Sequence, residues 1–405
     1  MNILYLDGYG IKINTKNLKR LSLLTITNGR NKHTSKQETH EFSPRKIPYD
    51  SIIIDGHSGY ISLQAFHWLS KNNIPVFVMD FDGTVLSNIL PPTPVKVDVK
   101  LSQIKLAFDR TTRFIVAKAL IQAKIIRSLQ VLDWLAERYD ITEHQKRAQA
   151  ETLSLFKAKT VSQIRTAEGR VALRYWQAIK STIPECFTFD GRTTGSHNNN
   201  AVDPINLTLN YAYGVLEGYC RKAINTVGLE PSIGFLHKYS DYQTKQSLVY
   251  DLQEPFRWIA DITTLEAFES GVLDLKDFYF FGNDYRYRIE VEAKRRFLKL
   301  FQEKFNSGAK YKGGVCKWDT IILRKTQELS RYLSGKTKKI DFAESPLKLE
   351  RNDTLGLRKR IMELTEKEAR ELGIGKSTLH YLRKNARSNK SFKTYRKVAQ
   401  KLLPV

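Results

Sequence analysis

The chain has 405 residues, which allows two or three domains, and its hydrophobic content of 41% predicts a folded protein. Lys and Arg number 66 against 42 Asp and Glu, and a net charge of +24 favours a phosphate backbone or an anionic membrane as partner. Because no apolar run reaches 18 residues, we expect no membrane span, and nucleic acid is the better partner.

The N-terminus and the cysteines indicate the compartment. The opening residues, MNILYLDGYGIKI, lack the charged and apolar segments of a secretory signal. Cys186, Cys220 and Cys316 are far apart and form neither a disulfide framework nor a zinc pattern. We therefore expect a cytoplasmic protein in a reducing environment.

Residues 1–94 are expected to form a β-rich domain. Short β-type runs are separated by Gly, Asn and Asp, as in hairpins and tight turns: ILYLDG, LSLLTITNG, SIIIDGH and IPVFVMDFDGTVLSN. One helix is predicted near residues 62–72, because Leu63, Phe66 and Leu69 share a helical face. The proline-rich segment 91–94 then closes the domain as a stiff linker.

The segment DFDGT within the last of these runs has two interpretations. Asp80 and Asp82 follow an apolar strand and resemble the nucleophile loop of haloacid-dehalogenase-like phosphatases. That fold requires alternating strands and helices, and a later acidic pair that binds Mg²⁺, whereas the next ~100 residues look helical. A hairpin turn is the favoured interpretation.

Residues 97–333 are expected to be helical. In residues 101–139 apolar side chains recur at three- and four-residue spacing with Lys and Arg between them. These basic residues either line a DNA-binding face or form a solvated helix surface: Arg110, Arg113, Lys118, Lys124 and Arg127. A polar loop is expected over 191–204, and a second basic helix over YRYRIEVEAKRRFLKLFQEKF.

Four residues of this region form a candidate metal site. His237 follows the apolar run GFL, Asp251 and Glu254 stand three residues apart in YDLQEPFR, and Glu168 lies upstream in RTAEGR. Carboxylates with one imidazole suit Mg²⁺ or Mn²⁺. The residues alone leave plainer interpretations open, namely a core or surface histidine and acids at helix N-termini.

A basic C-terminal domain is expected at 346–405, after a polar linker at 334–345. Residues 345–405 carry 16 Lys or Arg and 6 Asp or Glu. Thr365 and Glu368 form a capping-box pattern, Gly373 suits a turn, and a second helix starts at Lys376. This pattern predicts a helix-turn-helix, with an unrelated basic hairpin as the alternative. The residues expected to contact DNA are Lys376, Ser377, Thr378, His380, Arg383 and Lys384, together with Arg110 and Arg113 of the preceding domain.

The order of the motifs resembles the integrase family of CRISPR adaptation, the first CRISPR-associated protein. The resemblance rests on AKALIQAKI, the EG pair at Glu168, DPIN…LNY, GFLH and YDLQEPFR, and it covers about residues 1–333. It implies an α+β multidomain protein with an N-terminal β-domain and an α-helical catalytic domain. It also implies that Glu168, His237 and Glu254 are metal ligands, with Asp251 a supporting acid or alternate ligand.

The basic extension resembles casposases, the homologous integrases encoded by mobile elements. This resemblance implies a DNA integrase that uses Mn²⁺ or Mg²⁺ to join the 3′-OH ends of an element to double-stranded target DNA. It further implies a homo-oligomer on DNA, because two ends must be joined. The alternatives are a CRISPR-adaptation integrase with an added DNA-binding tail and a non-enzymatic DNA-binding regulator.

Overall fold

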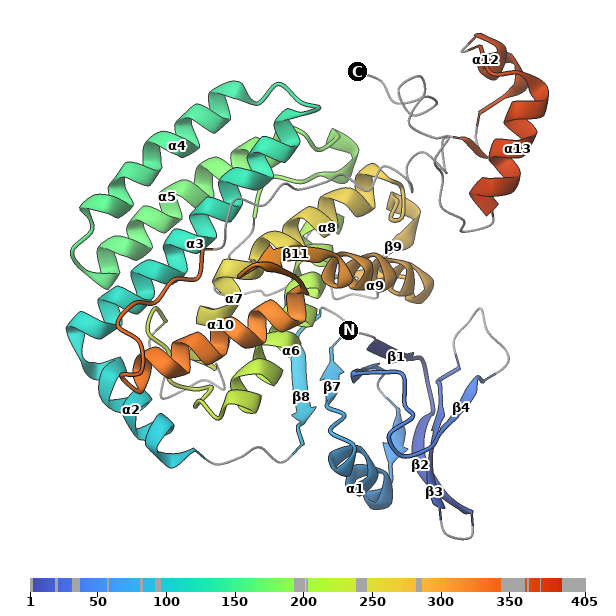
Figure 1. The fold of residues 1–405 in the computed structure, drawn as a ribbon. Helices are drawn as coiled ribbons and strands as arrows, with labels where there is room; N and C mark the ends of the chain where they lie inside the picture. The colour runs from blue at the N-terminus through green and yellow to red at the C-terminus, as the bar shows by residue number, and fades with distance from the viewer. Residues whose placement is uncertain are drawn as a thin grey trace.

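The computed structural model describes residues 3–18, 21–30, 37–56, 58–80, 83–91, 96–192, 201, 203–237, 246–281, 286–343, 361–362, 364–371 and 373–387. Strands dominate the N-terminal part and helices the part that follows, so the α+β prediction is confirmed (Figure 1). No described helix is long and apolar enough to cross a membrane.

The N-terminal domain contains two four-stranded sheets. One has the order β1(Ile3–Asp7), β5(Ser51–Asp55), β7(Val76–Met79) and β8(Val85–Ile89), in which only β8 runs antiparallel to its neighbour. The other has the order β4(Thr39–Phe42), β3(Leu21–Thr27), β2(Ile11–Leu18) and β6(Gly59–Ile61). Apolar side chains of both sheets and of helix α1 (Leu63–Lys71) form one core. Ser62 caps α1 by accepting a hydrogen bond from the Ala65 amide, close to the predicted start.

The described residues of the DFDGT segment lie between the two strands of a hairpin. Strands β7 and β8 pair antiparallel on either side of it. The Asp80 amide donates to the Thr84 carbonyl at 2.8 Å, and the Gly83 amide donates to the Asp80 carbonyl at 3.0 Å. Asp82 lies outside the described residues. A phosphatase nucleophile loop would lead into a helix, so the hairpin interpretation holds.

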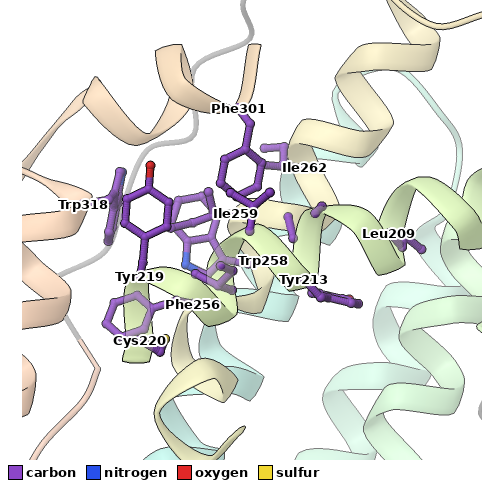
Figure 2. Close-up of a cluster of buried hydrophobic side chains, with 14 of the residues drawn as sticks. Leu209, Tyr213, Tyr219, Cys220, Phe256, Trp258, Ile259, Ile262, Phe301 and Trp318 are labelled. Atoms are coloured by element: carbon purple, nitrogen blue, oxygen red, sulfur yellow. The ribbon is translucent and has the colours of Figure 1, made fainter. Parts of the chain in front are cut away.

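The helical region is built around α6 (Pro204–Val227), which is buried along most of its length. Helix α6 packs against α8 (Arg257–Glu269) and α10 (Trp318–Leu333). Tyr219, Trp258 and Trp318 meet in this layer, and the two indole rings are 4.9 Å apart (Figure 2). The remaining helices of the region are α2 (Val97–Phe108), α3 (Arg110–Ala136), α4 (Thr142–Lys157), α5 (Val161–Lys180), α7 (Ser247–Gln253) and α9 (Val291–Asn306), with short turns η1 (Glu185–Phe187), η2 (Glu254–Phe256) and η3 (Leu275–Asp277).

Two hairpins interrupt the region that was expected to be helical. One pairs β9 (Phe278–Phe281) with β10 (Arg286–Ile289), and the other pairs β11 (Gly308–Tyr311) with β12 (Gly314–Lys317). The prediction of one basic helix beginning at YRYRI was therefore wrong at its start, because this run alternates as a strand and the helix begins at Val291.

Helix α9 ties the two domains together. Its Lys294 ammonium lies 2.6 Å from Asp55 Oδ2, and its Arg295 guanidinium bonds both oxygens of Asp7 at 2.7 and 2.9 Å. Asp7 and Asp55 end the adjacent parallel strands β1 and β5 and are buried. Each buried carboxylate therefore has a cationic partner from the other domain.

Two further segments follow α10. Part of the expected linker packs on the protein, since Phe342 is buried in the main core and Lys325 donates to the Asp341 carbonyl at 2.8 Å. Beyond it, α12 (Glu366–Glu371) and α13 (Lys376–Arg387) form a helical pair whose buried residues include Ala369 and Leu379. Thr365 and Glu368 exchange capping-box bonds of 2.8 and 3.2 Å. That this pair is a DNA-reading motif stays a prediction.

Candidate active site

Two of the predicted acids converge on one half-buried lysine. Glu168 lies on α5, Glu254 begins η2, and Lys124 reaches between them from α3. The Lys124 Nζ is 2.5 Å from Glu168 Oε1 and 2.7 Å from Glu254 Oε2. Residues far apart in sequence thus form one carboxylate–ammonium–carboxylate bridge, which the structure places at the junction of three helical elements.

Glu254 is ionised despite its burial. Burial alone would raise the pKa of this carboxyl, but Arg257 and Lys124 outweigh it and lower the pKa to about 2. The Arg257 Nε lies 3.3 Å from Glu254 Oε1. The pKa of Lys124 is shifted for the same reason. Burial lowers this pKa, but the charges of Glu254 and Glu168 raise it overall. Glu254 and Lys124 therefore both carry their charges at neutral pH.

Asp251 holds His237 and the loop before it. Its Oδ2 accepts hydrogen bonds from the amides of Phe235 and Leu236, the latter at 2.9 Å, and its Oδ1 accepts from the His237 amide at 3.0 Å. The same Oδ1 lies 2.7 Å from His237 Nδ1. Because the carboxylate can only accept, we assign the imidazole proton to Nδ1, which leaves Nε2 with its lone pair.

Close packing fixes this loop. A Cβ at Gly234 would lie 2.7 Å from Asp251 Oδ2 and 2.8 Å from the Ser247 carbonyl carbon, so only glycine fits there. Arg113 donates from Nε to the Phe235 carbonyl at 2.8 Å. The His237 side chain stays 38% exposed, while Asp251 is fully buried. Buried Asp251 thus fixes the orientation of the His237 imidazole, which is itself partly exposed to solvent.

A second polar network lies beside the bridge. The hydroxyls of Tyr175 and Tyr213 both donate to buried Asp261. The guanidinium groups of Arg257 and Arg192 stack on the Tyr213 ring at 4.9 and 5.2 Å. A cavity of ≈ 40 Å³ is lined by these residues together with Lys124, Glu168 and Glu254. The carboxylates therefore face a small space that is bordered by two arginines.

The prediction that five basic residues line one face of α3 is wrong for two of them. Lys124 points into the bridge, and Arg127 is buried, with its guanidinium donating to Gln130 and lying 6.0 Å from the Trp258 ring. Arg110 is exposed, Lys118 is half-buried over the Phe114 ring, and Arg113 anchors the loop before His237. Helix α3 contacts α2, α4, α5 and α8, so several of its faces are covered.

The predicted recognition residues lie on α13. Lys376, Ser377, Thr378 and His380 are exposed, whereas Arg383 is half-buried and donates to the Leu364 carbonyl at 2.6 Å. The side chain of Lys384 lies outside the described residues. Arg383 therefore has a structural bond within this pair, and its role in DNA contact remains a prediction.

Sequence reasoning missed the cations of the site. Arg257 was detectable, because it follows Glu254 by three residues and shares its helical face. Lys124 lies in the quoted segment AKALIQAKI, but no local pattern distinguishes it from the other basic residues of α3 as a partner of the two glutamates. Tyr213 lies two residues after the quoted motif LNY, but only the fold brings it to Asp261.

The donor chemistry of the site fits a divalent cation. Glu168 and Glu254 already converge on one positive charge. His237 offers Nε2 as a ligand, while its Nδ1 is hydrogen-bonded to the Asp251 carboxylate, as is usual for metal-bound imidazoles. In the described part of the chain, no three His, Cys, Asp or Glu side chains are grouped closely enough to hold a metal as they stand. The ammonium of Lys124 lies where the two carboxylates meet.

Comparisons with known proteins bear on the family of the chain. The family model of CRISPR associated protein Cas1 matches residues 18–303. A solved structure described as a casposase bound to integration product is 34% identical, covers 89% of this chain and 99% of its own, and has a TM-score of 0.78. The CRISPR-associated endonuclease Cas1 1 of Archaeoglobus fulgidus is 28% identical over 312 residues, which are 72% of this chain and 88% of that protein.

A CAS1 protein from Thermotoga maritima shares the fold, with a TM-score of 0.66 at 17% identity over 85% of this chain and 100% of its own. The family match spans well over half of the sequence and includes Glu168, His237, Asp251 and Glu254. By this match and its likeness to the casposase, the chain belongs to the family of CRISPR associated protein Cas1.

Proposed function

We propose that this chain is a casposase-type DNA integrase that joins the 3′-OH ends of a mobile element to target DNA with the help of a divalent cation. The observation that carries the proposal is the convergence of Glu168 and Glu254 on one cation, on a fold that resembles a DNA-bound casposase. His237, oriented by Asp251, completes the proposed site.

The proposed reaction is a transesterification. The 3′-oxygen of one strand attacks a target phosphorus, an O–P bond forms, and the O–P bond to the target's own 3′-oxygen breaks. The proton of the attacking hydroxyl leaves, and the departing oxygen takes up a proton. The number of phosphodiesters is unchanged, so no nucleotide hydrolysis is needed. With water as attacker, the same site would nick DNA.

Glu168, Glu254 and His237 Nε2 are the proposed ligands of Mg²⁺ or Mn²⁺. The chemistry that such an ion supplies is neutralisation of charge on the target phosphate and a lower pKa for the attacking hydroxyl. Asp251 would keep the imidazole in one tautomer and orientation. Lys124 would have to leave its place between the two carboxylates, and it could then compensate charge on the DNA.

Double-stranded DNA, as element ends and as target, is the proposed partner, and a homo-oligomer on DNA is the proposed assembly. The net charge of +24 supports a polyanion such as DNA as the binding partner. The exposed Lys376, Ser377, Thr378 and His380 on α13 are proposed to contact DNA, as is Arg110 at the start of α3. Two joined ends require two active sites, which a symmetric oligomer supplies.

Strand transfer of a labelled oligonucleotide into supercoiled plasmid with Mn²⁺ or Mg²⁺ tests the catalytic assignment. We expect His237→Ala and Glu254→Ala each to lower the rate by at least 100-fold, while the midpoint of DNA binding changes less than threefold. Glu143→Ala, which changes an exposed acid on α4, serves as the control. Activity of either variant at the wild-type rate, or full activity in EDTA, would refute the assignment.

The related endonucleases named for CRISPR also support a second candidate, an integrase that inserts DNA at a repeat array. Purified chain, element-end duplex, plasmid and Mn²⁺ are incubated without any other protein, and both junctions are sequenced. Paired insertions with staggered target cuts support the casposase type. Integration that requires an added partner subunit and occurs only at a repeat array favours the second candidate.

A further inference from the structure

A cavity lies where the start of α2 meets the last turns of α6 and α10, and we call it the α10 cavity. Its wall includes Lys96, Gln327, Ser330, Arg331 and Lys336. Its volume of ≈ 360 Å³ falls in the range of about 300–1,000 Å³ that is typical of small-ligand sites. Helices α2 and α10 contact each other at this place (Figure 1). None of the proposed metal ligands lines the cavity, so it is separate from the candidate active site.

The wall of the α10 cavity is positively charged. Lys96, Arg331 and Lys336 line it, and none of the three forms an ion pair with another described residue. Among the described residues, no Asp or Glu lines the cavity. Cations that converge on one small volume repel one another, and a bound anion would remove that repulsion. The charge of the wall therefore favours an anionic ligand.

Lys96 stands at a position where a lysine is unfavourable for the helix. It is the N-cap residue of α2, and its side chain makes no capping hydrogen bond. The first turn of a helix carries partial positive charge, so Ser, Thr, Asp or Asn is favoured at this position and a cation is not. Asp98 in the first turn offsets part of this cost, but it does not line the cavity. An anion in the cavity would stabilise both Lys96 and the start of α2.

Ser330 offers a hydroxyl to a ligand in the α10 cavity. The hydroxyls of Ser334 and Thr226, which also line the cavity, donate to the carbonyls of Ser330 and Lys222 at 2.8 and 2.7 Å. The Ser330 hydroxyl itself has no hydrogen-bond partner among the described residues, although Ser330 is only 9% exposed. Nearly buried polar groups are almost always hydrogen-bonded, so the expected partner is a molecule in the cavity.

We propose that the α10 cavity binds the 5′-phosphate monoester of a nucleotide, supplied by the end of a DNA strand or by a free nucleotide. Such a monoester carries a charge of about −1.5 to −2 at pH 7 and three accepting oxygens, which suits three cations and a hydroxyl donor. A phosphodiester within a duplex carries one charge, and the sugars on both sides of it hinder its entry into a cavity. A DNA end as the source rests on the proposed function, in which the 3′ end is a hydroxyl and the phosphate is therefore at the 5′ end.

The preference of the protein for a 5′-phosphate tests the proposal without strand transfer. Fluorescence anisotropy measures the dissociation constants of the full-length protein, in EDTA, for one duplex oligonucleotide with either 5′-phosphate or 5′-hydroxyl ends. We expect the phosphorylated duplex to bind at least about fivefold more tightly, because hydrogen bonds to an ionised acceptor are strong. The two duplexes differ only at their ends, so contacts elsewhere on the DNA cancel in the ratio of the two constants.

Variants of the cavity should remove this preference. Arg331→Gln/Lys336→Gln should reduce the ratio to below about twofold, and Ser330→Ala should reduce it in part. Arg331 and Lys336 are exposed, so the double variant should keep the wild-type circular dichroism spectrum and melting temperature. Lys299→Gln, which changes an exposed lysine of α9 outside the cavity, is the matched control and should keep the ratio. Glu254→Ala should also keep it, so a failure of the catalytic assignment and a failure of the cavity are distinguishable.

A second measurement identifies the source of the phosphate. Thymidine 5′-monophosphate is added to the wild type and to the double variant, with thymidine as the control, and the melting temperatures are compared. If the duplex ends make no difference, but the monophosphate raises the melting temperature of the wild type alone, the ligand is a free nucleotide. If neither the duplex ends nor the monophosphate distinguishes the wild type from Arg331→Gln/Lys336→Gln, the proposal is overturned.

Discussion

Replacing Lys124 with methionine removes the cation between Glu168 and Glu254 while keeping the length of the side chain. Glu254 then retains Arg257, whose Nε is 3.3 Å from Oε1. The shift of the Glu254 pKa from an ordinary 4.5 to about 2 corresponds to roughly 3 kcal/mol of stabilisation at neutral pH. Arg257 and Lys124 both contribute to this stabilisation. We therefore expect Lys124→Met to lower the free energy of unfolding by about 2 kcal/mol.

The pH dependence follows from the direction of the shift. A carboxyl whose pKa is depressed in the folded state stabilises the protein above its unfolded pKa, and this stabilisation is lost as the pH falls toward 2. The difference between wild type and Lys124→Met should therefore be largest at neutral pH. It should shrink as the pH falls from about 4.5 toward 2.

Urea denaturation in EDTA, followed at pH 7 and pH 4, measures these differences. Lys304→Met is the matched control, because Lys304 lies 2.7 Å from buried Glu266 away from the site. Mn²⁺ should restore part of the stability lost in Lys124→Met and none of that lost in Lys304→Met. Equal stability of wild type and Lys124→Met at pH 7 would refute the electrostatic argument, and equal Mn²⁺ effects in the two variants would refute the shared cation site.

Further predictions concern the neighbouring glycines, the support of His237 and the tail. Gly234→Ala should lower the free energy of unfolding by about 1–3 kcal/mol, because the new methyl group would collide with Asp251. Gly169→Ala should raise it by about 0.5–1 kcal/mol, because this position lies inside α5 and a Cβ there would meet nothing within 4 Å. Urea titrations measure both changes. Asp251→Asn should reduce strand transfer at least tenfold with DNA binding unchanged, and wild-type rates would rule out its proposed support of His237. Truncation after residue 345 should weaken DNA binding and flatten its salt dependence in gel shifts; an unchanged salt slope would count against a DNA-binding tail.

The positions of the acids were predictable because the motifs are local, whereas their bonding was not. Sequence placed Glu168, His237, Asp251 and Glu254 in one proposed site, and the fold pairs Asp251 with His237 and brings Glu168 near Glu254. It could not reveal that a lysine links the two glutamates. A helix of 27 residues that contacts several neighbours offers no single outward face on which to sort its basic residues.

Short strands were the other source of error. The helix near residues 62–72 was predictable from its apolar face, and α1 begins at Leu63 after the Ser62 cap. The run YRYRI was read as helix because a basic, apolar segment leads directly into α9. Its strand character depends on pairing with Phe278–Phe281, a contact that no local pattern specifies.

The ion pairs of α9 mean that the boundary near residue 94 is a poor place to divide the protein. A fragment that begins at residue 96 would retain Lys294 and Arg295 but lose both of their aspartates. Lys294, which is buried in the intact protein, and Arg295 would then have no β-sheet packed against them. Such a fragment is expected to fold badly on its own, and dissection of the enzyme should keep β1 and β5 attached to the helices.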